Sequence, residues 1–265
     1  MSIKIDLSGS VALVTGASGG IGKGIVQALH DAGATVIAAD RDLSVLESTF
    51  AHMPERVESV AFDVTDEADV ARGLESVASV GAPTIVVNGA GVAGRTGMPF
   101  TRLDQRDWSL PWQVNVVGTF LVSKAVSSAM IAAGGGAIVN IASVSGRTGF
   151  QTSPPYSASK AAVINITQVM ARDLAVHNVR VNSICPGMVF TPFYAQQRSA
   201  VAENDPVAAA QTDEEFFAAK VVRSIPLGRG QTPQDVGNAV VFLASPLAGN
   251  ITGQALNVDG GLVMS

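Results

Sequence analysis

The sequence predicts an α/β fold in which seven parallel strands form one doubly wound sheet with helices on both of its faces. Three observations support this prediction. Short β-branched runs alternate with helical patterns along the chain. Several of these runs are apolar almost throughout, which is typical of strands buried on both faces. A glycine-rich turn follows the first run, where such sheets bind ligands. No Pro/Gly/Ser linker or repeat divides residues 1–265, so we expect a single domain.

The expected strands are short and rich in Val, Ile and Ala. In chain order they are Ser10–Thr15, Thr35–Asp40, Val57–Val64, Thr84–Asn88, Ala137–Ser143, Arg180–Cys185 and Gln254–Val258. Between the first two strands, Ile21, Ile25, Ala28 and Leu29 form one apolar helical stripe that Gly33 terminates. The other expected helices are Thr65–Val80, Asp104–Ala133, Tyr156–Asn178 and Pro233–Ala244, the last with Thr232 as N-cap.

Two stretches depart from this regular pattern. Pro111 falls inside an expected helix, so this helix either starts later or bends just before Asn115. Residues 190–230 lie outside the alternation and are expected to form a substrate lid. This insertion combines acidic with aromatic residues: Glu203, Asp205, Asp213, Glu214 and Glu215, with Phe193, Tyr194, Phe216 and Phe217.

Composition excludes several classes of function. The net charge of −5 and the lack of a basic run argue against a nucleic-acid partner. The single Cys185 rules out an internal disulfide, and His30, His52 and His177 have no metal-binding context, so no metal is expected. The N-terminus lacks a signal peptide, and no apolar run approaches about 20 residues. We therefore expect a soluble cytoplasmic protein without a membrane partner.

Tyr156 and Lys160 are the residues that most directly indicate chemistry. In a helix they are four residues apart and share one face. A phenol ordinarily has a pKa near 10, and a nearby ammonium favours the phenolate, which lowers that pKa toward a useful acid/base range. Taken alone, the pair is better explained as an ordinary helix that happens to carry Tyr and Lys, so its meaning depends on the rest of the chain.

The first strand runs into a turn that suits a dinucleotide. Gly16, Gly20 and Gly22 permit the backbone to approach a pyrophosphate at the N-terminus of the following helix, with Ser18 and Ile21 in the same turn. This places a Rossmann-type cofactor site at the first strand-to-helix crossover.

Acidic and small residues follow the next strands. Asp40 ends the second strand and is expected to accept hydrogen bonds from both ribose hydroxyls of NAD and to repel a 2′-phosphate, with Arg41 beside it. Asp63 is expected at the end of the third strand, where it either meets the adenine or caps a helix with Thr65. Asn88-Gly89-Ala90-Gly91 ends the fourth strand and lets a ring or ribose pass close to the backbone.

Together these motifs resemble the short-chain dehydrogenase/reductase family. The matching residues are Thr15-Gly16-x-x-x-Gly20-Ile21-Gly22, Asp63-Val64, Asn88-Gly89-Ala90-Gly91, Asn115, Ser143, Tyr156-x-x-x-Lys160, Pro186-Gly187 and Thr191. The gaps of 28 residues from Asn115 to Ser143 and 13 from Ser143 to Tyr156 are also similar to the family's spacing. The resemblance covers nearly the whole chain. Gly89 and Pro111 depart from the family pattern, and Gly19 stands where NADPH-dependent fatty-acid reductases of the family often have Arg.

The resemblance implies a catalytic tetrad. Tyr156 is the general acid/base, and Lys160 lowers its pKa and holds the nicotinamide ribose. Ser143 orients the substrate oxygen, and Asn115 holds a water that links Lys160 to solvent. Val64, Asn88, Ala90, Gly91, Pro186, Gly187, Val189 and Thr191 complete the expected cofactor site.

The function that this resemblance implies is hydride transfer between NAD(H) and a secondary alcohol or ketone, with a polyol, sugar or small secondary alcohol as the expected substrate. Two alternatives stay open: an NADPH-dependent 3-oxoacyl-thioester reductase and a non-catalytic dinucleotide-binding regulator. Expected substrate contacts are Ser143, Ser145, Gln151, Met188 and Phe193, with Phe150, Pro154, Pro155, Tyr194 and the loop Ala93–Met98 around them. Arg95 and Arg147 are candidate partners for a substrate carboxylate, although surface exposure explains each of them better. The family resemblance also implies a homotetramer.

Overall fold

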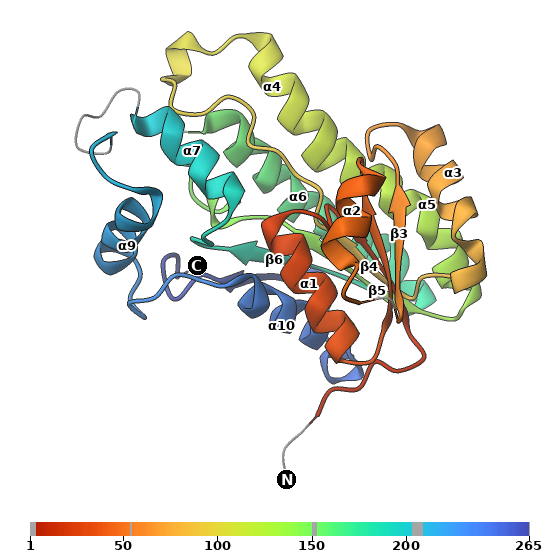
Figure 1. Ribbon diagram of the computed structural model, residues 1–265. Helices are drawn as coiled ribbons and strands as arrows, with labels where there is room; N and C mark the ends of the chain where they lie inside the picture. The colour runs from red at the N-terminus through yellow and green to blue at the C-terminus, as the bar shows by residue number, and fades with distance from the viewer. Residues whose placement is uncertain (1–3, 54, 150–152, 203–208, 265) are drawn as a thin grey trace.

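A computed structural model describes residues 4–53, 55–149, 153–202 and 209–264. Seven strands form one parallel sheet in the order β3-β2-β1-β4-β5-β6-β7, so the predicted doubly wound sheet is confirmed (Figure 1). The strands are β1 (Val11–Thr15), β2 (Thr35–Asp40), β3 (Val57–Ala61), β4 (Ile85–Asn88), β5 (Gly136–Ile141), β6 (Val179–Pro186) and β7 (Ala255–Val258).

Helices cover both faces of the sheet. Helices α1 (Gly20–Asp31), α2 (Leu43–Phe50) and α10 (Pro233–Ala244) share one hydrophobic cluster with one side of the strands. Helices α3 (Glu67–Ser76), α5 (Gly118–Ala132) and α6 (Pro154–Leu174) share a second cluster with the other side. Alternate residues of β1 divide between these layers, because Val14 belongs to the first cluster and Leu13 to the second.

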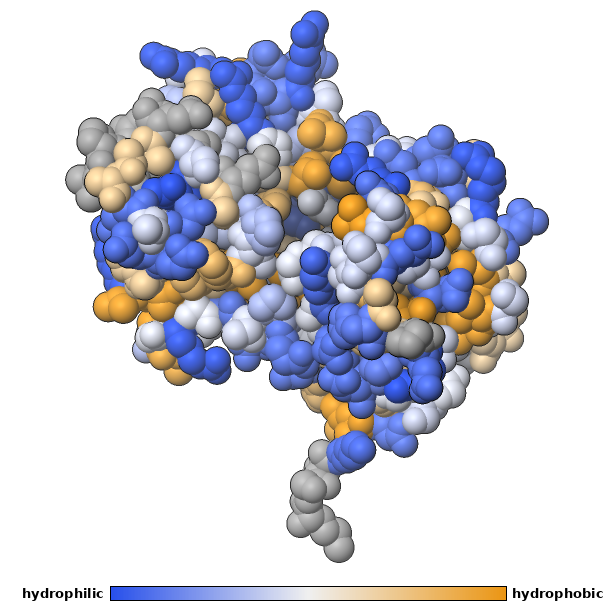
Figure 2. All heavy atoms as spheres, in the orientation of Figure 1, coloured by the Kyte–Doolittle hydropathy of each residue, from blue (hydrophilic) through white to orange (hydrophobic). Residues whose placement is uncertain are grey.

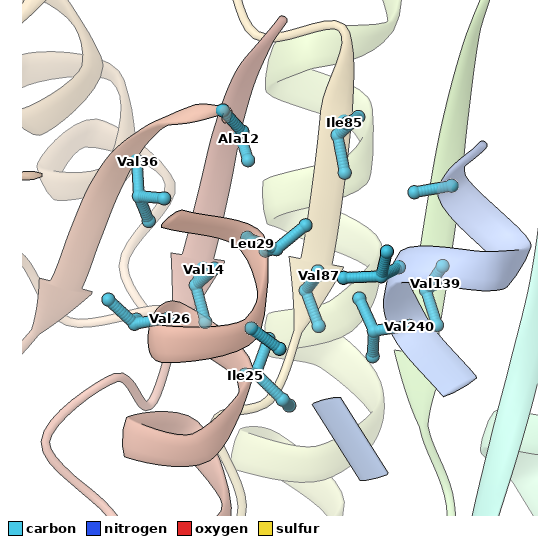
Figure 3. Close-up of a cluster of buried hydrophobic side chains, with 14 of the residues drawn as sticks. Ala12, Val14, Ile25, Val26, Leu29, Val36, Ile85, Val87, Val139 and Val240 are labelled. Carbon is cyan, nitrogen blue, oxygen red and sulfur yellow. The ribbon is translucent and has the colours of Figure 1, made fainter. Parts of the chain in front are cut away.

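The first cluster anchors the helix that begins at the glycine-rich turn. Ile25 and Leu29 of α1 are fully buried and lie over the central strands β1 and β4, next to Val240 of α10 (Figure 3). Close packing of α1 on α10 requires small residues, and a Cβ on Gly237 would lie 2.5 Å from the backbone oxygen of Gly24. The start of α1 is therefore held rigidly against the sheet.

Two strands end earlier than the sequence predicts. β3 ends at Ala61, so Asp63 lies in the loop after the strand rather than at its end. β5 ends at Ile141, which leaves Ser143 just beyond the strand as the N-cap of a short 3-10 turn. Both residues still lie at the carboxyl edge of the sheet. Buried residues continue past each strand end, which explains why the sequence pattern extended the strands too far.

The helix around Pro111 begins where the sequence predicts and then changes its hydrogen bonding. Helix α4 (Gln105–Pro111) starts with a capping box between Asp104 and Asp107, and a π-helical segment, Trp112–Val117, follows Pro111 directly and leads into α5. The expected irregularity before Asn115 is therefore confirmed, and the alternative of a later start is wrong. Pro111 has no backbone N–H to donate to the preceding turn of an α-helix. This missing hydrogen bond favours the wider, π-helical turn that follows it.

The stretch Gln105–Ala132 is long and apolar enough, by length and composition alone, to cross a membrane. Half of its most apolar window is buried inside the protein, where α5 contributes Val122, Val126 and Met130 to the second cluster. These residues cover the sheet, so the apolar character of this helix is accounted for by the core of the fold.

Three α-helices of the described residues lie where the sequence analysis assigned none. Helix α2 begins after the N-cap Asp42, whose side chain accepts a hydrogen bond from the backbone N–H of Val45. Helices α7 (Pro192–Ala202) and α9 (Asp213–Ser224) lie within the 190–230 insertion, apart from the sheet (Figure 1). The acidic Glu203 and Asp205 of this insertion lie outside the described residues. We call α7 and α9 the insertion helices.

Candidate active site

One cavity of about 660 Å³ runs along the carboxyl edge of the sheet, from the end of β2 to the insertion helices. The chain reverses its direction of progress across the sheet between β1 and β4, and both strands end at this cavity. A crevice opens at such a reversal because the connections on either side lead to opposite faces. The fold therefore places the glycine-rich turn and Tyr156 on the walls of a single cavity.

The glycine-rich turn forms a close cradle at one end of the cavity. Gly16 has a φ of +67°, and a Cβ there would lie 2.7 Å from the backbone nitrogen of Ala90. The N-cap of α1, Gly19, has no side chain to bond the first N–H groups of the helix. These donors and the helix dipole suit an anion, so the turn fits the pyrophosphate of a dinucleotide.

Asp40 stands beside this cradle at the end of β2. Its carboxylate accepts a hydrogen bond from the Ser18 hydroxyl at 2.5 Å and another from the backbone N–H of Arg41 at 2.8 Å. Each carboxylate oxygen can accept more than one hydrogen bond, so capacity remains for the hydroxyl groups of a ribose. Asp40 and Arg41 both line the cavity, as predicted.

Asp63 combines parts of both alternatives that the sequence left open. It lines the cavity beside Val64, where an adenine is expected. Its Oδ1 also accepts hydrogen bonds from the backbone N–H and the hydroxyl of Thr65, at 2.9 and 2.8 Å. It does not cap α3, because the N-cap of that helix is Asp66.

Asn88 is the expected cofactor residue that the structure turns away from the cavity. Its amide nitrogen donates to Ser123 Oγ at 2.9 Å and to Asn140 Oδ1 at 2.8 Å within the buried layer between β4, β5 and α5. Ala90 and Gly91, which follow Asn88, do line the cavity. The backbone N–H of Ala90 donates to Thr15 Oγ1 at 3.3 Å, so this loop is bonded to the end of β1. Asn88 therefore anchors the start of the loop after β4 on the side that faces away from the cavity.

Tyr156 is buried near the N-terminus of α6, with Ser143 opposite it. Burial raises the pKa of Tyr156 to about 12, and a hydrogen bond with Ser143 opposes this rise. The expected lowering of this pKa by Lys160 does not occur in the protein alone, because removal from water is the larger effect. The ring of Tyr156 contacts Phe193 of α7, with 5.6 Å between ring centroids.

Lys160 lies one turn further along α6 and is also buried. Its ammonium donates to the carbonyl oxygen of Ile141 at 2.6 Å and lies 5.7 Å from the centre of the Tyr156 ring. Burial lowers the pKa of Lys160 to about 8. A Cβ on Gly91 would be 3.3 Å from both Lys160 Nζ and Asn115 Oδ1, so only a glycine leaves this junction open.

Asn115 reaches this junction from the π-helical segment. Its amide donates to Val92 O at 3.0 Å and to Ser159 Oγ at 2.9 Å, and its Oδ1 accepts from Val92 N–H at 2.8 Å. Asn115 does not line the cavity itself. It joins the loop after β4 to α6, directly behind Lys160.

The opposite wall follows β6. Pro186, Gly187, Met188, Val189 and Thr191 all line the cavity, as predicted. A Cβ on Gly20 would lie 2.5 Å from Thr191 Cγ2, so the start of α1 and the loop after β6 meet across the cavity. The two ends of the expected cofactor site therefore come together although about 170 residues separate them in the sequence.

Most of the predicted site residues share the cavity. Those that line it are Gly16, Ser18, Gly20, Ile21, Gly22, Asp40, Arg41, Asp63, Val64, Ala90, Gly91, Ser143, Ser145, Tyr156, Lys160, Pro186, Gly187, Met188, Val189, Thr191 and Phe193. The residues Ala93–Met98, Pro154 and Pro155 were also expected in the wall, but they are not among the residues that line the cavity. Phe150 and Gln151 lie outside the described residues.

Sequence reasoning missed several residues of the cavity wall. Leu110 and Val114 reach it from the helix around Pro111, and Lys220 and Ser224 reach it from α9. Both pairs have a spacing of four residues, which is the signal that one face of a helix turns toward the site. The sequence analysis did not assign a helix at Asp213–Ser224, so this signal was overlooked.

Lys160 predicts a pH dependence of stability. Its pKa is about 8 in the folded protein against 10.5 ordinarily, so the unfolded chain binds more protons between these values. The stability contribution of Lys160 therefore increases as pH rises from 8 toward 10. We expect the free energy of unfolding of the wild type, relative to Lys160→Met, to rise by at most about 1.4 kcal/mol per pH unit from pH 8 to 9.5. Urea denaturation of both proteins measures it, and a difference that is independent of pH would contradict the assignment.

Comparisons with known proteins agree with this geometry. The family model described as Enoyl-(Acyl carrier protein) reductase matches residues 16–263. The chain is 36% identical over 262 residues to the 3-oxoacyl-(acyl-carrier-protein) reductase FabG of Thermotoga maritima, covering 97% of this chain and 99% of that protein. It is also 36% identical over 261 residues to galactitol 2-dehydrogenase of Agrobacterium fabrum, covering 98% and 99%.

A solved structure extends the likeness to three dimensions. The gluconate 5-dehydrogenase from Burkholderia cenocepacia, in complex with NADP and tartrate, has a TM-score of 0.85 and 32% sequence identity, covering 98% of this chain and 97% of that chain. The matched regions include the glycine-rich turn, the loop after β4 and the Tyr156–Lys160 pair. The chain therefore belongs to the short-chain dehydrogenase/reductase family, as an oxidoreductase that acts on alcohols or ketones with a nicotinamide dinucleotide.

Proposed function

We propose that this protein is an NAD-dependent dehydrogenase of secondary alcohols that also reduces the matching ketones. The observation that carries the proposal is the placement of Ser143, Tyr156 and Lys160 on the same cavity as the glycine-rich turn. A binding module has no use for a buried phenol hydrogen-bonded to a serine beside a buried ammonium. This argues against a non-catalytic regulator.

Tyr156, Ser143 and Lys160 have separate roles in proton transfer. Tyr156 gives its proton to a carbonyl oxygen during reduction or accepts one from an alcohol during oxidation. Ser143, already hydrogen-bonded to Tyr156, orients the same oxygen. A nicotinamide dinucleotide held in this cavity would supply or accept the hydride at the substrate carbon. Lys160, whose Nζ lies 5.7 Å from the centre of the Tyr156 ring, would favour the phenolate electrostatically when it is protonated.

Asn115 completes the proposed proton route. It lies behind Lys160 and fixes the loop that contains Val92 against α6. A water at the open junction beside Gly91 would connect Lys160 to solvent, and the absence of a Cβ at Gly91 leaves room for it. In this role Asn115 acts through Lys160 and not on the substrate.

Asp40 supports NAD as the cofactor. Its carboxylate stands beside the glycine-rich turn and is hydrogen-bonded to Ser18, so a 2′-phosphate would meet a fixed negative charge. Gly19, where an Arg would attract that phosphate, supplies no cation. The gluconate 5-dehydrogenase holds NADP, so the family likeness alone does not decide the cofactor of this chain.

The substrate class follows from relatives and cavity together. Galactitol 2-dehydrogenase and gluconate 5-dehydrogenase act on polyols or sugar acids by their names, which supports a polyol, sugar or small secondary alcohol here. The FabG relative favours a second candidate, an NADPH-dependent 3-oxoacyl-thioester reductase. Asp40 argues against NADPH, and the acidic insertion is unsuited to a strongly anionic carrier protein.

A screen with both cofactors tests this proposal. Polyols, sugars and secondary alcohols are each offered with NAD⁺ and NADP⁺, and acetoacetyl thioesters are offered with NADH and NADPH, with absorbance of the reduced cofactor as readout. We expect a higher kcat/KM with NAD⁺, and Asp40→Ser to raise the NADP⁺/NAD⁺ ratio about 10- to 100-fold by removing like-charge repulsion. Efficient NADPH-driven reduction of the thioesters would instead establish the second candidate. A wild-type preference for NADP⁺ would refute the role of Asp40.

Assembly and location remain predictions. We propose a homotetramer in the cytoplasm, supported by exposed apolar residues on the long helices, including Phe120 and Ile131 of α5 and Val169 of α6. Light scattering distinguishes this assembly from a 27.1 kDa monomer.

A further inference from the structure

The charge of the cavity wall differs between its two ends. Among the described residues that line the cavity, the acidic side chains are Asp40 and Asp63, and both lie at the expected cofactor end. The cationic ones are Arg41, Lys160 and Lys220. Arg41 is next to Asp40, and Lys160 is bonded to Ile141 O beneath Tyr156. Lys220 is therefore the cation of the described wall that remains for a substrate.

Lys220 belongs to the face of α9 that borders the cavity. Phe217, Lys220, Val221 and Ser224 follow the spacing i, i+3, i+4 and i+7, which places them on one helical face. Val221 is buried, and Lys220 and Ser224 line the cavity. The outer surface over α9 is mostly hydrophilic (Figure 2). Lys220 and Ser224 border the cavity and are also exposed to solvent, so both are accessible to a molecule that enters it.

The ammonium of Lys220 has no carboxylate partner among the residues that the structure describes. It makes no ion pair there and instead lies 4.8 Å from the centre of the Phe216 ring. Partial burial, and then the nearby Arg223, lower the pKa of Lys220. A cation without a counter-charge is expected to show such a lowered pKa. An anion bound beside Lys220 would stabilise its charged form and raise the pKa again.

The neighbouring wall suits a small organic anion. Leu110, Met188 and Phe193 add apolar surface to the cavity wall, and Phe193 contacts the ring of Tyr156. Tyr194 also lines this end, and its hydroxyl is buried without a hydrogen-bond partner among the described residues. One free cation, one unpaired hydroxyl and an apolar wall form a typical specificity arrangement of a ligand cavity.

We propose that Lys220 binds an anionic group on the substrate, so that the preferred substrates are secondary alcohols or ketones carrying a carboxylate, sulfonate or phosphate. This inference rests on the proposed function and narrows its substrate class. It also replaces the two arginines that the sequence offered as partners for a substrate carboxylate. Arg95 pairs with Asp107 at 3.6 Å and Arg147 donates to the carbonyl oxygen of Ala255, and neither lines the cavity.

Matched substrates and variants test the proposal. 3-Hydroxybutanoate is compared with the neutral 3-hydroxybutanamide, and sulfonate and phosphate analogues identify which anion fits. We expect the wild type to prefer the anion about 10- to 100-fold in kcat/KM, as one charge-assisted hydrogen bond provides. Lys220→Met should abolish this preference through KM, with kcat changed less than about threefold, because Lys220 binds ground state and transition state alike. Lys220→Arg should restore much of the preference.

The control is Arg223→Met, which removes a cation from the same helix that does not line the cavity. We expect it to retain most of the preference. An equal loss in both variants would show a general field effect and overturn the assignment, as would a preference that survives Lys220→Met. Calorimetric titration of 3-hydroxybutanoate and its amide into the protein with NADH measures the same preference without turnover. Preferential binding of the acid without oxidation would therefore refute the proposed function and leave the anion site standing.

Discussion

Replacement of Tyr156 by Phe is expected to lower kcat by about 10²- to 10⁴-fold, the usual contribution of a positioned general acid/base. The substitution removes the hydroxyl that Ser143 contacts and retains the ring that packs on Phe193. Because the glycine-rich turn and Asp40 are untouched, the affinity for NADH should stay within a few-fold of the wild type. Steady-state kinetics and NADH fluorescence titration measure the two quantities separately.

Tyr194 provides the matched control, since the chain has two tyrosines and both line the cavity. Its hydroxyl makes no hydrogen bond within the described structure, so Tyr194→Phe removes the same atom from the same cavity without breaking a contact. We expect a far smaller loss of kcat for this variant. Full activity of Tyr156→Phe, or equal losses in both variants, would refute the assignment of Tyr156 as the proton donor.

The second large effect is expected at Gly22. A methyl group there would overlap the carbonyl oxygen of Gly16 and lie 2.8 Å from Ala17 Cα. Both obstacles are backbone, so the turn itself must move. We expect Gly22→Ala to lower the free energy of unfolding by about 1–3 kcal/mol, as overpacking does. The displaced turn should also weaken NADH binding, by about tenfold for every 1.4 kcal/mol of lost contact.

Gly149→Ala is the appropriate control for this experiment. A Cβ at Gly149 meets nothing within 4 Å, and its φ lies outside the left-handed region. Its stability should be unchanged or slightly higher, because alanine restricts the unfolded chain more than glycine does. Urea denaturation and NADH titration of both variants decide the outcome. Wild-type NADH affinity in Gly22→Ala would show that the turn does not cradle the cofactor.

The sheet and most of the cavity wall were predictable because they depend on local patterns. Buried parallel strands are apolar throughout, and in a doubly wound sheet their carboxyl ends meet at one edge. Asp40, at the end of a strand, and Gly91 and Ser143, a few residues beyond strand ends, accordingly line one cavity. The β3 boundary was missed because Phe62 and Val64 remain buried beyond the last ladder hydrogen bond.

Features that depend on tertiary packing could not be predicted. The direction of the Asn88 side chain is fixed by Ser123 and Asn140, which are 35 and 52 residues away in the sequence. Likewise, the pKa of Tyr156 depends on how completely the fold removes the phenol from water. The spacing of Tyr156 and Lys160 indicates that an ammonium lies near the phenol, which would lower the pKa of Tyr156. The spacing does not indicate that the phenol is buried, and burial raises this pKa in the protein alone.

The π-helical segment at Trp112–Val117 has a consequence for engineering. It interrupts an otherwise continuous helix in order to aim Asn115 at Val92 and Ser159, at the cost of irregular backbone hydrogen bonding. Substitutions chosen only to raise the melting temperature would tend to regularise this turn and rotate Asn115 out of place. Stability and turnover thus compete at this one turn, and thermostabilised variants should leave it unaltered.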